Sequence, residues 1–340
     1  MKRILLTGGG TGGHIMPLLA VAECLPKDCE ILVLGSNIKN IKFPYKNVLA
    51  GKWRRYFSLK NFVDILKGPL GILQALWHVF WFMPDVCFGK GGYASLPGVL
   101  ACWLYRIPIV IHESDTVPGI ANRFLAFFAD KVCVSFEQAK KYFPEKKVIF
   151  TGNPVRQQIL HGKIFQKDKP VVLVLGGSQG AQYINEVVSA ILPDLLKKAR
   201  VVHQCGPGKT SNIALPGYEQ YEFIENIEDF YASADVIVSR AGANSLAEIS
   251  ALKKPAILIP LPGSSFEHQR ENAYVFAENS AAIVIEQENL GPYLLRDKLF
   301  KLLDEPLVAQ KMGEHAYDLN PSDAAEKIAE AVDNLWIDRE

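Results

Sequence analysis

Short apolar runs rich in β-branched residues recur along the chain, and segments with helical spacing of apolar residues separate them. In the first half the predicted strands are Arg3–Thr7, Glu30–Leu34, Val86–Phe88, Ile107–His112, Lys131–Ser135 and Lys147–Thr151. In the second half they are Val171–Leu175, Arg200–Cys205, Tyr221–Ile224, Asp235–Ser239, Ala256–Pro260 and Ala281–Ile285. Strands that are apolar throughout belong to parallel sheets covered on both faces. Each half is therefore predicted to be a doubly wound α/β domain.

Both halves begin in the same way, with a strand, a glycine-rich turn and a helix. Ile4–Thr7 leads into Gly8–His14, and Val172–Leu175 leads into Gly176–Ala181. A length of 340 residues suits two domains, with the polar stretch Gly152–Lys169 as the linker. Ligands of open α/β sheets bind at the carboxyl ends of the strands, so we expect the active site in a cleft between facing domains.

The composition is that of a folded protein, because 49% of the residues are hydrophobic and only 21% are charged. The six cysteines show no CxxC pair and no metal-ligand spacing, which predicts buried, reduced thiols. The apolar run after Met1 is too short for a signal peptide, and no segment is a good membrane-spanning helix.

Charge is distributed unevenly between the halves. Residues 1–150 hold 19 Lys and Arg against 10 Asp and Glu, a net charge of +9. Residues 151–340 hold 18 against 26, a net charge of −8. One interpretation is that the basic half faces an anionic surface. The alternative is chance combined with the charge that solubility requires.

The glycine turns predict phosphate binding, because they present backbone N–H groups at a helix N-terminus. The first turn satisfies GxGxxG, but the second strand runs into Gly35 and Ser36 without the acid that would hold the ribose of a dinucleotide. NAD binding is therefore disfavoured. A P-loop is excluded, since neither turn carries Gly-Lys-Ser/Thr.

His14 opens the helix after the first turn, where the helix dipole favours the neutral imidazole. A neutral imidazole can act as a general base. The alternative is a polar residue that only caps the helix.

A second group of polar residues lies in Ser239–Glu248, which ends a strand and starts a helix. The N–H groups of Ala243–Leu246 can hold phosphate or sugar oxygens, and the Glu248 carboxylate can accept ribose hydroxyls. The alternative for Glu248 is an acid that only complements the helix dipole. The amides of Phe266–Ala273 suit hydroxyl recognition, although a single amide is more often plain surface.

An apolar segment, Gly68–Pro84, follows a basic stretch without acids. The basic residues are Lys39, Lys42, Lys46, Lys52, Arg54, Arg55 and Lys60. One helix face should pack on the sheet, whereas a second apolar face with Trp77, Phe80 and Trp81 predicts shallow insertion into anionic lipid. The alternative is a helix buried on all sides.

These segments together resemble the MurG family, the bacterial UDP-N-acetylglucosamine transferases that convert lipid I to lipid II in peptidoglycan synthesis. The matching stretches occur in family order: Gly8–His14, Gly89–Gly98, His112–Glu113, Gly152–Arg156, Gly176–Ala181, Ser239–Glu248 and His268–Ala273.

The resemblance implies a GT-B glycosyltransferase with two Rossmann-like domains. The acceptor and membrane-facing domain would span 1–156, with a C-terminal helix within 320–340 packing back on it, and 157–319 would bind the UDP-sugar donor. The implied reaction is inverting transfer of N-acetylglucosamine to the C4 hydroxyl of N-acetylmuramic acid on lipid I. The implied partners are UDP-N-acetylglucosamine, polyprenyl-linked lipid I, an anionic membrane surface at the cytoplasmic face, and other proteins of cell-wall synthesis or division. No nucleic acid, metal or other cofactor is expected.

The resemblance also assigns roles to single residues. Ile224 would contact the uracil through its backbone and Glu248 the ribose. The other implied donor contacts are Thr11, Gly12, Gly13, Asp115, Arg156, Ser178, Ala243, Asn244, Ser245, Leu246, Ala247 and Gln269.

The proposed base is His14, with Glu113 and Asp115 as the substitutes. Many family members have Asn where this chain has Asp115, so Asp115 either replaces a sugar contact of the amide or adds a negative charge beside the acceptor. Three rival functions stay open at this point: a diacylglycerol glycosyltransferase, a UDP-N-acetylglucosamine epimerase and a non-catalytic UDP-sugar-binding scaffold.

Overall fold

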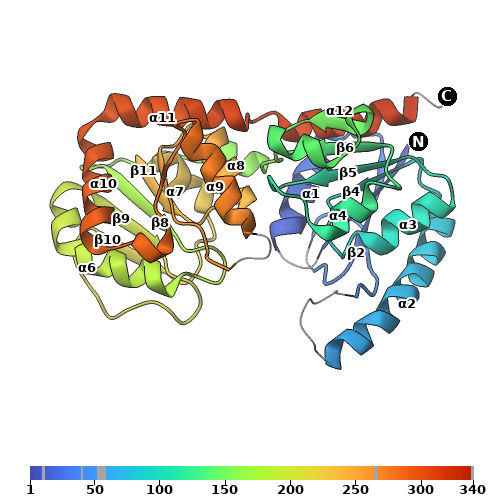
Figure 1. The fold of residues 1–340 in the computed structure, drawn as a ribbon, viewed down its shortest axis with the longest axis horizontal. Helices are drawn as coiled ribbons and strands as arrows, with labels where there is room; N and C mark the ends of the chain where they lie inside the picture. Colours follow the sequence, from blue (N-terminus) through green and yellow to red (C-terminus); the bar gives the residue numbers. More distant parts are fainter. Residues whose placement is uncertain (10–11, 40, 52–58, 264–266, 338–340) are drawn as a thin grey trace. The chain divides into compact units, whose positions relative to one another are not determined.

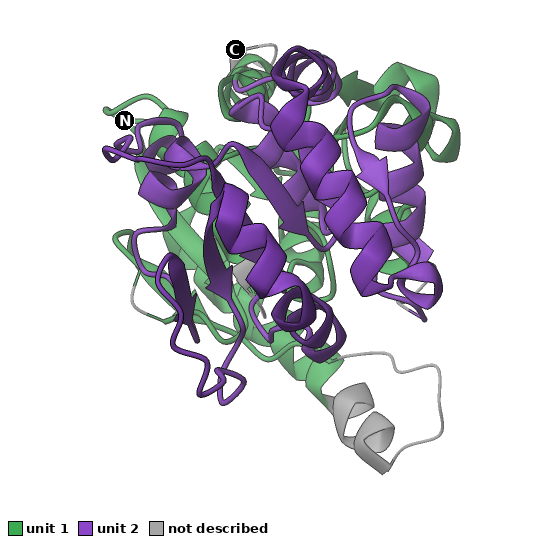
Figure 2. Cartoon of the chain, turned by 90° about the vertical axis from the view of Figure 1, so that its left-hand side faces the viewer, with its two compact units in different colours: residues 1–156, 323–340 green, residues 157–322 purple. Residues whose placement is uncertain are grey.

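The computed structural model describes residues 1–9, 12–39, 41–51, 59–263 and 267–337. It contains two compact units, which Figure 2 shows in different colours. Unit 1 comprises Met1–Arg156 together with Asp323–Glu340, and unit 2 comprises Gln157–Ser322. Each unit is built around its own parallel sheet.

The sheet of unit 1 has seven parallel strands in the order β3-β2-β1-β4-β5-β6-β7. Their bounds are β1 Arg3–Thr7, β2 Glu30–Gly35, β3 Tyr45–Asn47, β4 Val86–Gly89, β5 Ile109–Glu113, β6 Lys131–Val134 and β7 Val148–Phe150. Every strand predicted for the first half is present within two residues at either end. The short edge strand β3 was not predicted, because all three of its residues are exposed and none belongs to an apolar run.

Helices cover both faces of this sheet. They are α1 Gly12–Cys24, α2 Leu59–Phe82, α3 Leu96–Leu104, α4 Ile120–Leu125 and α12 Ala324–Ile337, with short 3₁₀ turns at Glu137–Tyr142 and Glu145–Lys147. Alternate residues of β1 serve the two faces, as a pleated strand requires. Ile4 and Leu6 pack in a cluster with residues of α1 and α12, whereas Leu5 packs with residues of α2 and α3. In Figure 1, α2 lies alongside α3, and the two helices are in contact.

The sheet of unit 2 has six parallel strands in the order β10-β9-β8-β11-β12-β13. Their bounds are β8 Val171–Leu175, β9 Arg200–Gln204, β10 Tyr218–Tyr221, β11 Val236–Ser239, β12 Ala256–Leu258 and β13 Ile283–Val284. The prediction of a strand at Tyr221–Ile224 was wrong by three residues. This edge strand pairs through Tyr218–Tyr221, which is half polar, and the apolar Phe223 and Ile224 follow it in a loop.

The helices of unit 2 are α5 Gln157–Leu160, α6 Gln182–Lys198, α7 Ile227–Ser233, α8 Ala243–Ala251, α9 His268–Glu278, α10 Pro292–Asp304 and α11 Pro306–Leu319. A short 3₁₀ turn spans Gln287–Asn289. In both units the first strand lies in the interior of the sheet. The direction in which successive strands are added changes next to it, between β1 and β4 in unit 1 and between β8 and β11 in unit 2. The carboxyl ends of the strands at such a reversal are the usual ligand site of an open α/β sheet.

Candidate active site

The first glycine turn packs tightly against the end of β2. A β-carbon at Gly35 would overlap the Gly8 carbonyl oxygen, and one at Gly9, whose φ is +137°, would overlap the Ser36 carbonyl oxygen. Gly8 N–H also donates to Leu34 O at 3.2 Å. An acidic side chain therefore has no room at position 35, which removes one anchor of a dinucleotide ribose.

The helix after this turn begins at Gly12, so the backbone of Gly12, Gly13 and His14 forms the first turn of α1. Thr11 and the side chain of His14 lie outside the described residues.

The carboxyl ends of β4, β5 and β7 come together around Lys90. This residue follows β4 and its side chain is only 1% exposed. Its Nζ lies 2.9 Å from His112 Nδ1 on β5 and 3.5 Å from Asn153 Oδ1 after β7, and it donates to Ser114 Oγ. This buried lysine was not among the predicted site residues, because its partners are far apart in the sequence.

His112 extends this network to the end of β7. Its Nε2 lies 3.0 Å from Gly152 O and 3.2 Å from Ser135 Oγ. Burial lowers the pKa of His112 well below its usual value, and the charge of Lys90 lowers it further. A neutral imidazole whose Nδ1 accepts from Lys90 donates its Nε2–H to Gly152 O.

Glu113 is 3% exposed, and its carboxylate oxygens accept hydrogen bonds from the loop after β5 and from α4. Oε1 accepts from Asp115 N–H at 2.9 Å, and Oε2 accepts from Asn122 Nδ2 at 2.8 Å and Gly119 N–H at 3.3 Å. Burial raises the pKa of Glu113, the charge of Asp115 raises it too, and these hydrogen bonds and Lys90 offset part of the rise. Such a carboxylate positions the loop that carries the half-buried Asp115.

The glycine turn of unit 2 is held by backbone and lysine contacts. Gly180 N–H donates to Gly177 O at 2.9 Å. Lys209 Nζ donates to Gln179 O at 2.7 Å and to Gly180 O at 3.2 Å. Ser178, a predicted donor contact, is exposed at the top of this turn. Lys209 was not predicted, since it lies some thirty residues away in a polar loop.

Helix α8 starts at Ala243 with Gly242 as its N-cap. Leu246 N–H already donates to Gly242 O at 3.0 Å, so the prediction that this N–H serves the donor does not fit the structure. The N–H groups before it, in the first turn, precede the intrahelical ladder. Ala243, Asn244, Ser245 and Glu248 are half-buried, whereas Leu246 and Ala247 are buried.

Arg240, at the end of β11, fixes the loop beyond β12. Its Nη1 donates to Ile259 O at 3.1 Å and Pro260 O at 3.2 Å, and its Nη2 donates to Gln287 Oε1 at 2.7 Å. In the same loop Leu261 N–H donates to Gln269 Oε1 at 3.0 Å. This hydrogen bond orients the Gln269 amide and leaves its Nε2 group available to donate to a sugar hydroxyl.

Ile224 is 2% exposed, and its N–H donates to Gln204 Oε1 at 3.1 Å. For this N–H to donate a hydrogen bond to a uracil, its hydrogen bond to Gln204 would have to break. Arg156, the last residue of the first segment of unit 1, is half-buried.

Two family models together match most of the chain. Residues 4–134 match the glycosyltransferase family 28 N-terminal domain, and residues 171–334 match the glycosyltransferase family 28 C-terminal domain. A curated relative from Lachnospira eligens is 41% identical over 89% of this chain and 91% of its own length. It is named UDP-N-acetylglucosamine--N-acetylmuramyl-(pentapeptide) pyrophosphoryl-undecaprenol N-acetylglucosamine transferase. The chain belongs to the MurG family.

Other members of the MurG family match over almost the full length. A relative from Bacillus cereus, with the same name followed by the number 2, is 38% identical over 98% of this chain and 99% of its own length. The crystal structure of MurG from Acinetobacter baumannii superimposes with a TM-score of 0.75 at 28% identity, covering 98% of this chain and 100% of that one. The predicted GT-B fold and the predicted glycosyltransferase class are confirmed.

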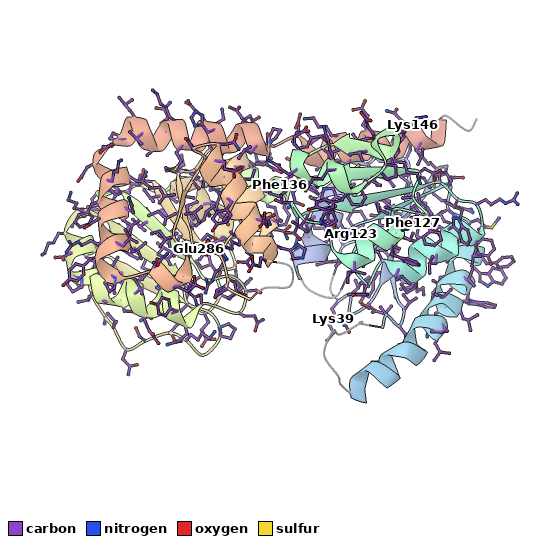
Figure 3. All side chains as sticks on the ribbon, viewed as in Figure 1. Lys39, Arg123, Phe127, Phe136, Lys146 and Glu286 are labelled. Carbon is purple, nitrogen blue, oxygen red and sulfur yellow. The ribbon has the colours of Figure 1, made fainter. Side chains whose placement is uncertain are left out.

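The outer face of α2 is apolar and exposed in this MurG-family chain. Trp77 is 63%, Phe80 51% and Trp81 66% exposed, whereas Ala75 and Val79 on the opposite side are buried in the core. The alternative of a helix buried on all sides is therefore wrong. Further exposed apolar side chains lie on α2, α3 and α4 and just after them: Leu70, Leu73, Met83, Trp103, Leu104, Ile120, Phe124 and Phe127. Figure 3 labels Phe127, which is 80% exposed, and Arg123 on α4.

Within the described residues of this MurG-family chain, no helix is long and apolar enough to cross a membrane. The same residues contain no group of three or more His, Cys, Asp or Glu side chains that could hold a metal ion.

Proposed function

We propose that this chain transfers N-acetylglucosamine from UDP-N-acetylglucosamine to the C4 hydroxyl of the N-acetylmuramic acid of lipid I, forming lipid II. The observation that carries the proposal is the 41% identity, over nine-tenths of both chains, to a relative named for this transfer. The placement of the predicted residues at the carboxyl ends of strands in each unit supports it.

The proposed donor site lies on unit 2, and Arg156 is a further proposed donor contact. The Glu248 carboxylate accepts hydrogen bonds from the ribose hydroxyls. The Ile224 backbone contacts the uracil, and its N–H can do so once its hydrogen bond to Gln204 is broken. Ser178 and the first-turn N–H groups of Ala243, Asn244 and Ser245 bind the diphosphate and sugar. The Gln269 Nε2–H donates a hydrogen bond to a sugar hydroxyl, with the amide oriented by the hydrogen bond from Leu261 N–H to its Oε1.

In the proposed reaction His14 removes the proton of the acceptor hydroxyl as that oxygen attacks the anomeric carbon. The bond from that carbon to UDP breaks with inversion. Helix N-terminal N–H groups and Arg156 stabilise the leaving diphosphate, so we propose that no metal is needed. Thr11, Gly12 and Gly13 border the transferred sugar. Glu113 acts as a positioning residue instead of a substitute base, since three donors hold its oxygens.

The proposed location is the cytoplasmic face of the cell membrane, as a peripheral protein among other cell-wall synthesis or division proteins. The exposed aromatic residues of α2 and the basic residues Lys39, Lys42 and Lys46, which precede this helix in the sequence, support this location.

The deciding experiment measures transfer of radiolabelled N-acetylglucosamine from its UDP donor to a lipid I analogue, with and without EDTA. We expect product in both cases. Absence of product in a protein that binds UDP would overturn the proposed reaction, whereas loss of product only with EDTA would overturn metal independence. The variant His14→Ala should lower kcat by at least about 100-fold with UDP affinity retained. Near-normal turnover would remove His14 from the mechanism.

A further inference from the structure

A cavity of about 360 Å³ in unit 2 involves none of the residues assigned to the donor or the acceptor. Helix α6, strands β9 and β10 and the loop between these strands form its walls. Four buried polar side chains line it: Asn185, His203, Cys205 and Tyr218. Small-molecule sites are cavities of this kind, with a few polar groups in fixed positions, and the volume suits a molecule smaller than a nucleotide.

The hydrogen bonds of this buried group fix the positions of its protons. Asn185 Nδ2 donates to Cys205 O at 3.0 Å, so Asn185 Oδ1 accepts from His203 Nε2–H at 3.0 Å. His203 Nδ1 then accepts from Tyr218 O–H at 3.1 Å. Burial lowers the pKa of His203 to about 4, in agreement with a neutral imidazole. The buried group is therefore uncharged near neutral pH, and any charge in the cavity comes from its other side chains.

Two further side chains of the lining carry opposite charges, Glu186 on α6 and Lys209 on the loop between β9 and β10. Gln182 Nε2 donates to Glu186 Oε1 at 3.0 Å, which leaves Glu186 Oε2 able to accept. Lys209 Nζ donates to Gln179 O at 2.7 Å and to Gly180 O at 3.2 Å, and an ammonium group has a third N–H to donate. A carboxylate and an ammonium group that line one cavity are complementary to a ligand with one group of each charge.

We propose that this cavity binds a small zwitterion of the amino-acid class and that its occupancy weakens binding of the UDP-sugar donor. The ammonium group of the ligand pairs with Glu186, and its carboxylate pairs with Lys209. Ile213 and the ring of Tyr218 offer apolar surface to an aliphatic side chain of the ligand.

Lys209 couples the cavity to the donor site. Its two carbonyl acceptors belong to the glycine turn that carries Ser178, a proposed donor contact. A carboxylate accepts from an ammonium group more strongly than a backbone carbonyl does, so the ligand draws Lys209 away from this turn. The proposal rests on the proposed function in this one respect, the assignment of Ser178 to the donor site. Because coupling between two sites is reciprocal, UDP also weakens binding of the amino acid.

Alkylation of a cysteine in the cavity wall tests occupancy directly. Ser189 lines the cavity on α6 and is half-buried, so Ser189→Cys places a thiol beside the ligand. The probes are alanine, valine and leucine, each in its L and D form. At about 10 mM, at least one should slow alkylation of position 189 by iodoacetamide at least about threefold, as measured by mass spectrometry of the peptides.

The matched control is Thr210→Cys, at an exposed position outside the lining, which should react at an unchanged rate. No slowing by any probe, or equal slowing in this control, would overturn the proposed site.

Two analogues of the protecting amino acid test the recognition of its charges. The N-acetyl derivative lacks the ammonium group, and the amide lacks the carboxylate. Each should require at least about tenfold higher concentration for the same protection. Glu186→Gln should weaken protection by the amino acid and leave protection by the N-acetyl derivative unchanged. Equal protection by all three compounds would overturn recognition of a zwitterion.

Calorimetric titration with UDP tests the coupling. A saturating concentration of the protecting amino acid should lower the UDP affinity of the parent protein about fivefold. Lys209→Met should remove this difference. Lys209→Arg, which keeps the charge, and Lys197→Met, at an exposed position on α6, should retain it. An unchanged UDP affinity of the parent, or the same difference in Lys209→Met, would overturn the coupling. A parent protein that binds no UDP would instead refute the proposed donor site, while the alkylation experiment still tests the cavity.

Discussion

Gly180 and Gly206 lie backbone against backbone in unit 2: a β-carbon at Gly206 would be 2.5 Å from Gly180 Cα, and one at Gly180 would overlap the Cys205 carbonyl oxygen. Both sides of this approach are fixed. Asn185 Nδ2 donates to Cys205 O at 3.0 Å, and Lys209 Nζ donates to Gly180 O at 3.2 Å. The turn that carries Ser178 therefore depends on glycine at these two positions.

Gly180→Ala should lower UDP affinity by at least about tenfold and the free energy of unfolding by about 2 kcal/mol. The alanine would have to adopt a φ of +68° and also displace the Cys205 backbone. Calorimetric titration with UDP and urea unfolding measure the two effects. Gly208→Ala is the matched control, since its φ is +66° but nothing lies within 4 Å of the new β-carbon. Equal losses in both variants would show that backbone conformation, and not the close approach, requires the glycine.

Arg240→Met should lower the free energy of unfolding by about 3 kcal/mol, because it leaves buried acceptors without their donor. These acceptors are the carbonyl oxygens of Ile259 and Pro260, with Gln287 Oε1 beside them. Urea unfolding followed by circular dichroism measures the change. Lys301→Met, on the exposed face of α10, should change stability by less than about 0.5 kcal/mol. Equal stability of the two variants would contradict a structural role for Arg240.

His203 should make the folded protein less stable in acid. It is fully buried, its Nε2 lies 3.0 Å from Asn185 Oδ1, and its Nδ1 lies 3.1 Å from Tyr218 OH. Burial lowers the pKa of His203 to about 4, whereas an unfolded histidine has a pKa of about 6.5. A lowered folded-state pKa gives stability that is complete above pH ~6.5 and is lost as the pH falls toward the folded value.

For this one group the loss between pH 7 and pH 5 is about 2 kcal/mol. Urea unfolding at several pH values should show a shallower decline for His203→Gln, which has no group to titrate there. His161→Gln, at an exposed position in the same unit, should keep the slope of the parent. A His203→Gln variant with the parent's slope would contradict this assignment.

The sequence predicted the elements whose signals are local. β1 and β8 have the predicted bounds, because each contains a run of apolar residues and is followed directly by glycine. The edge strands were harder: β3 is polar and exposed, and β10 was placed three residues late because the apolar Phe223 and Ile224 follow it. In a parallel sheet, edge strands need fewer apolar residues than central ones, so the apolar pattern weakens there.

The same contrast holds at the site. The glycine turns and the starts of α1 and α8 could be located from short stretches of sequence. The contacts of Lys90 with His112 and Asn153 could not, because they depend on the order in which β4, β5 and β7 enter one sheet. The sequence also could not show which backbone N–H groups already donate within the protein. Ile224 N–H donates to Gln204 Oε1, and Leu246 N–H donates to Gly242 O.

Replacing both Trp77 and Trp81 with Ser should weaken binding to anionic vesicles by at least about tenfold. The two rings lie 5.7 Å apart in an edge-to-face arrangement on the exposed side of α2, so both can enter a lipid surface together. Insertion removes their apolar surface from water, at about 25 cal/mol per Å². Sedimentation with phosphatidylglycerol vesicles measures the effect.

The matched control is Tyr293→Ser, which removes an aromatic side chain that is 76% exposed on unit 2. It should leave vesicle binding unchanged, because Tyr293 is a single exposed aromatic ring on α10, whereas α2 exposes Trp77, Phe80 and Trp81 together. Higher salt should weaken binding of the parent protein, since Lys39, Lys42 and Lys46 contribute by electrostatic attraction. Unchanged sedimentation of the double variant would refute insertion through α2. Salt-sensitive binding that persists without the two tryptophans would instead assign the contact to the basic residues alone.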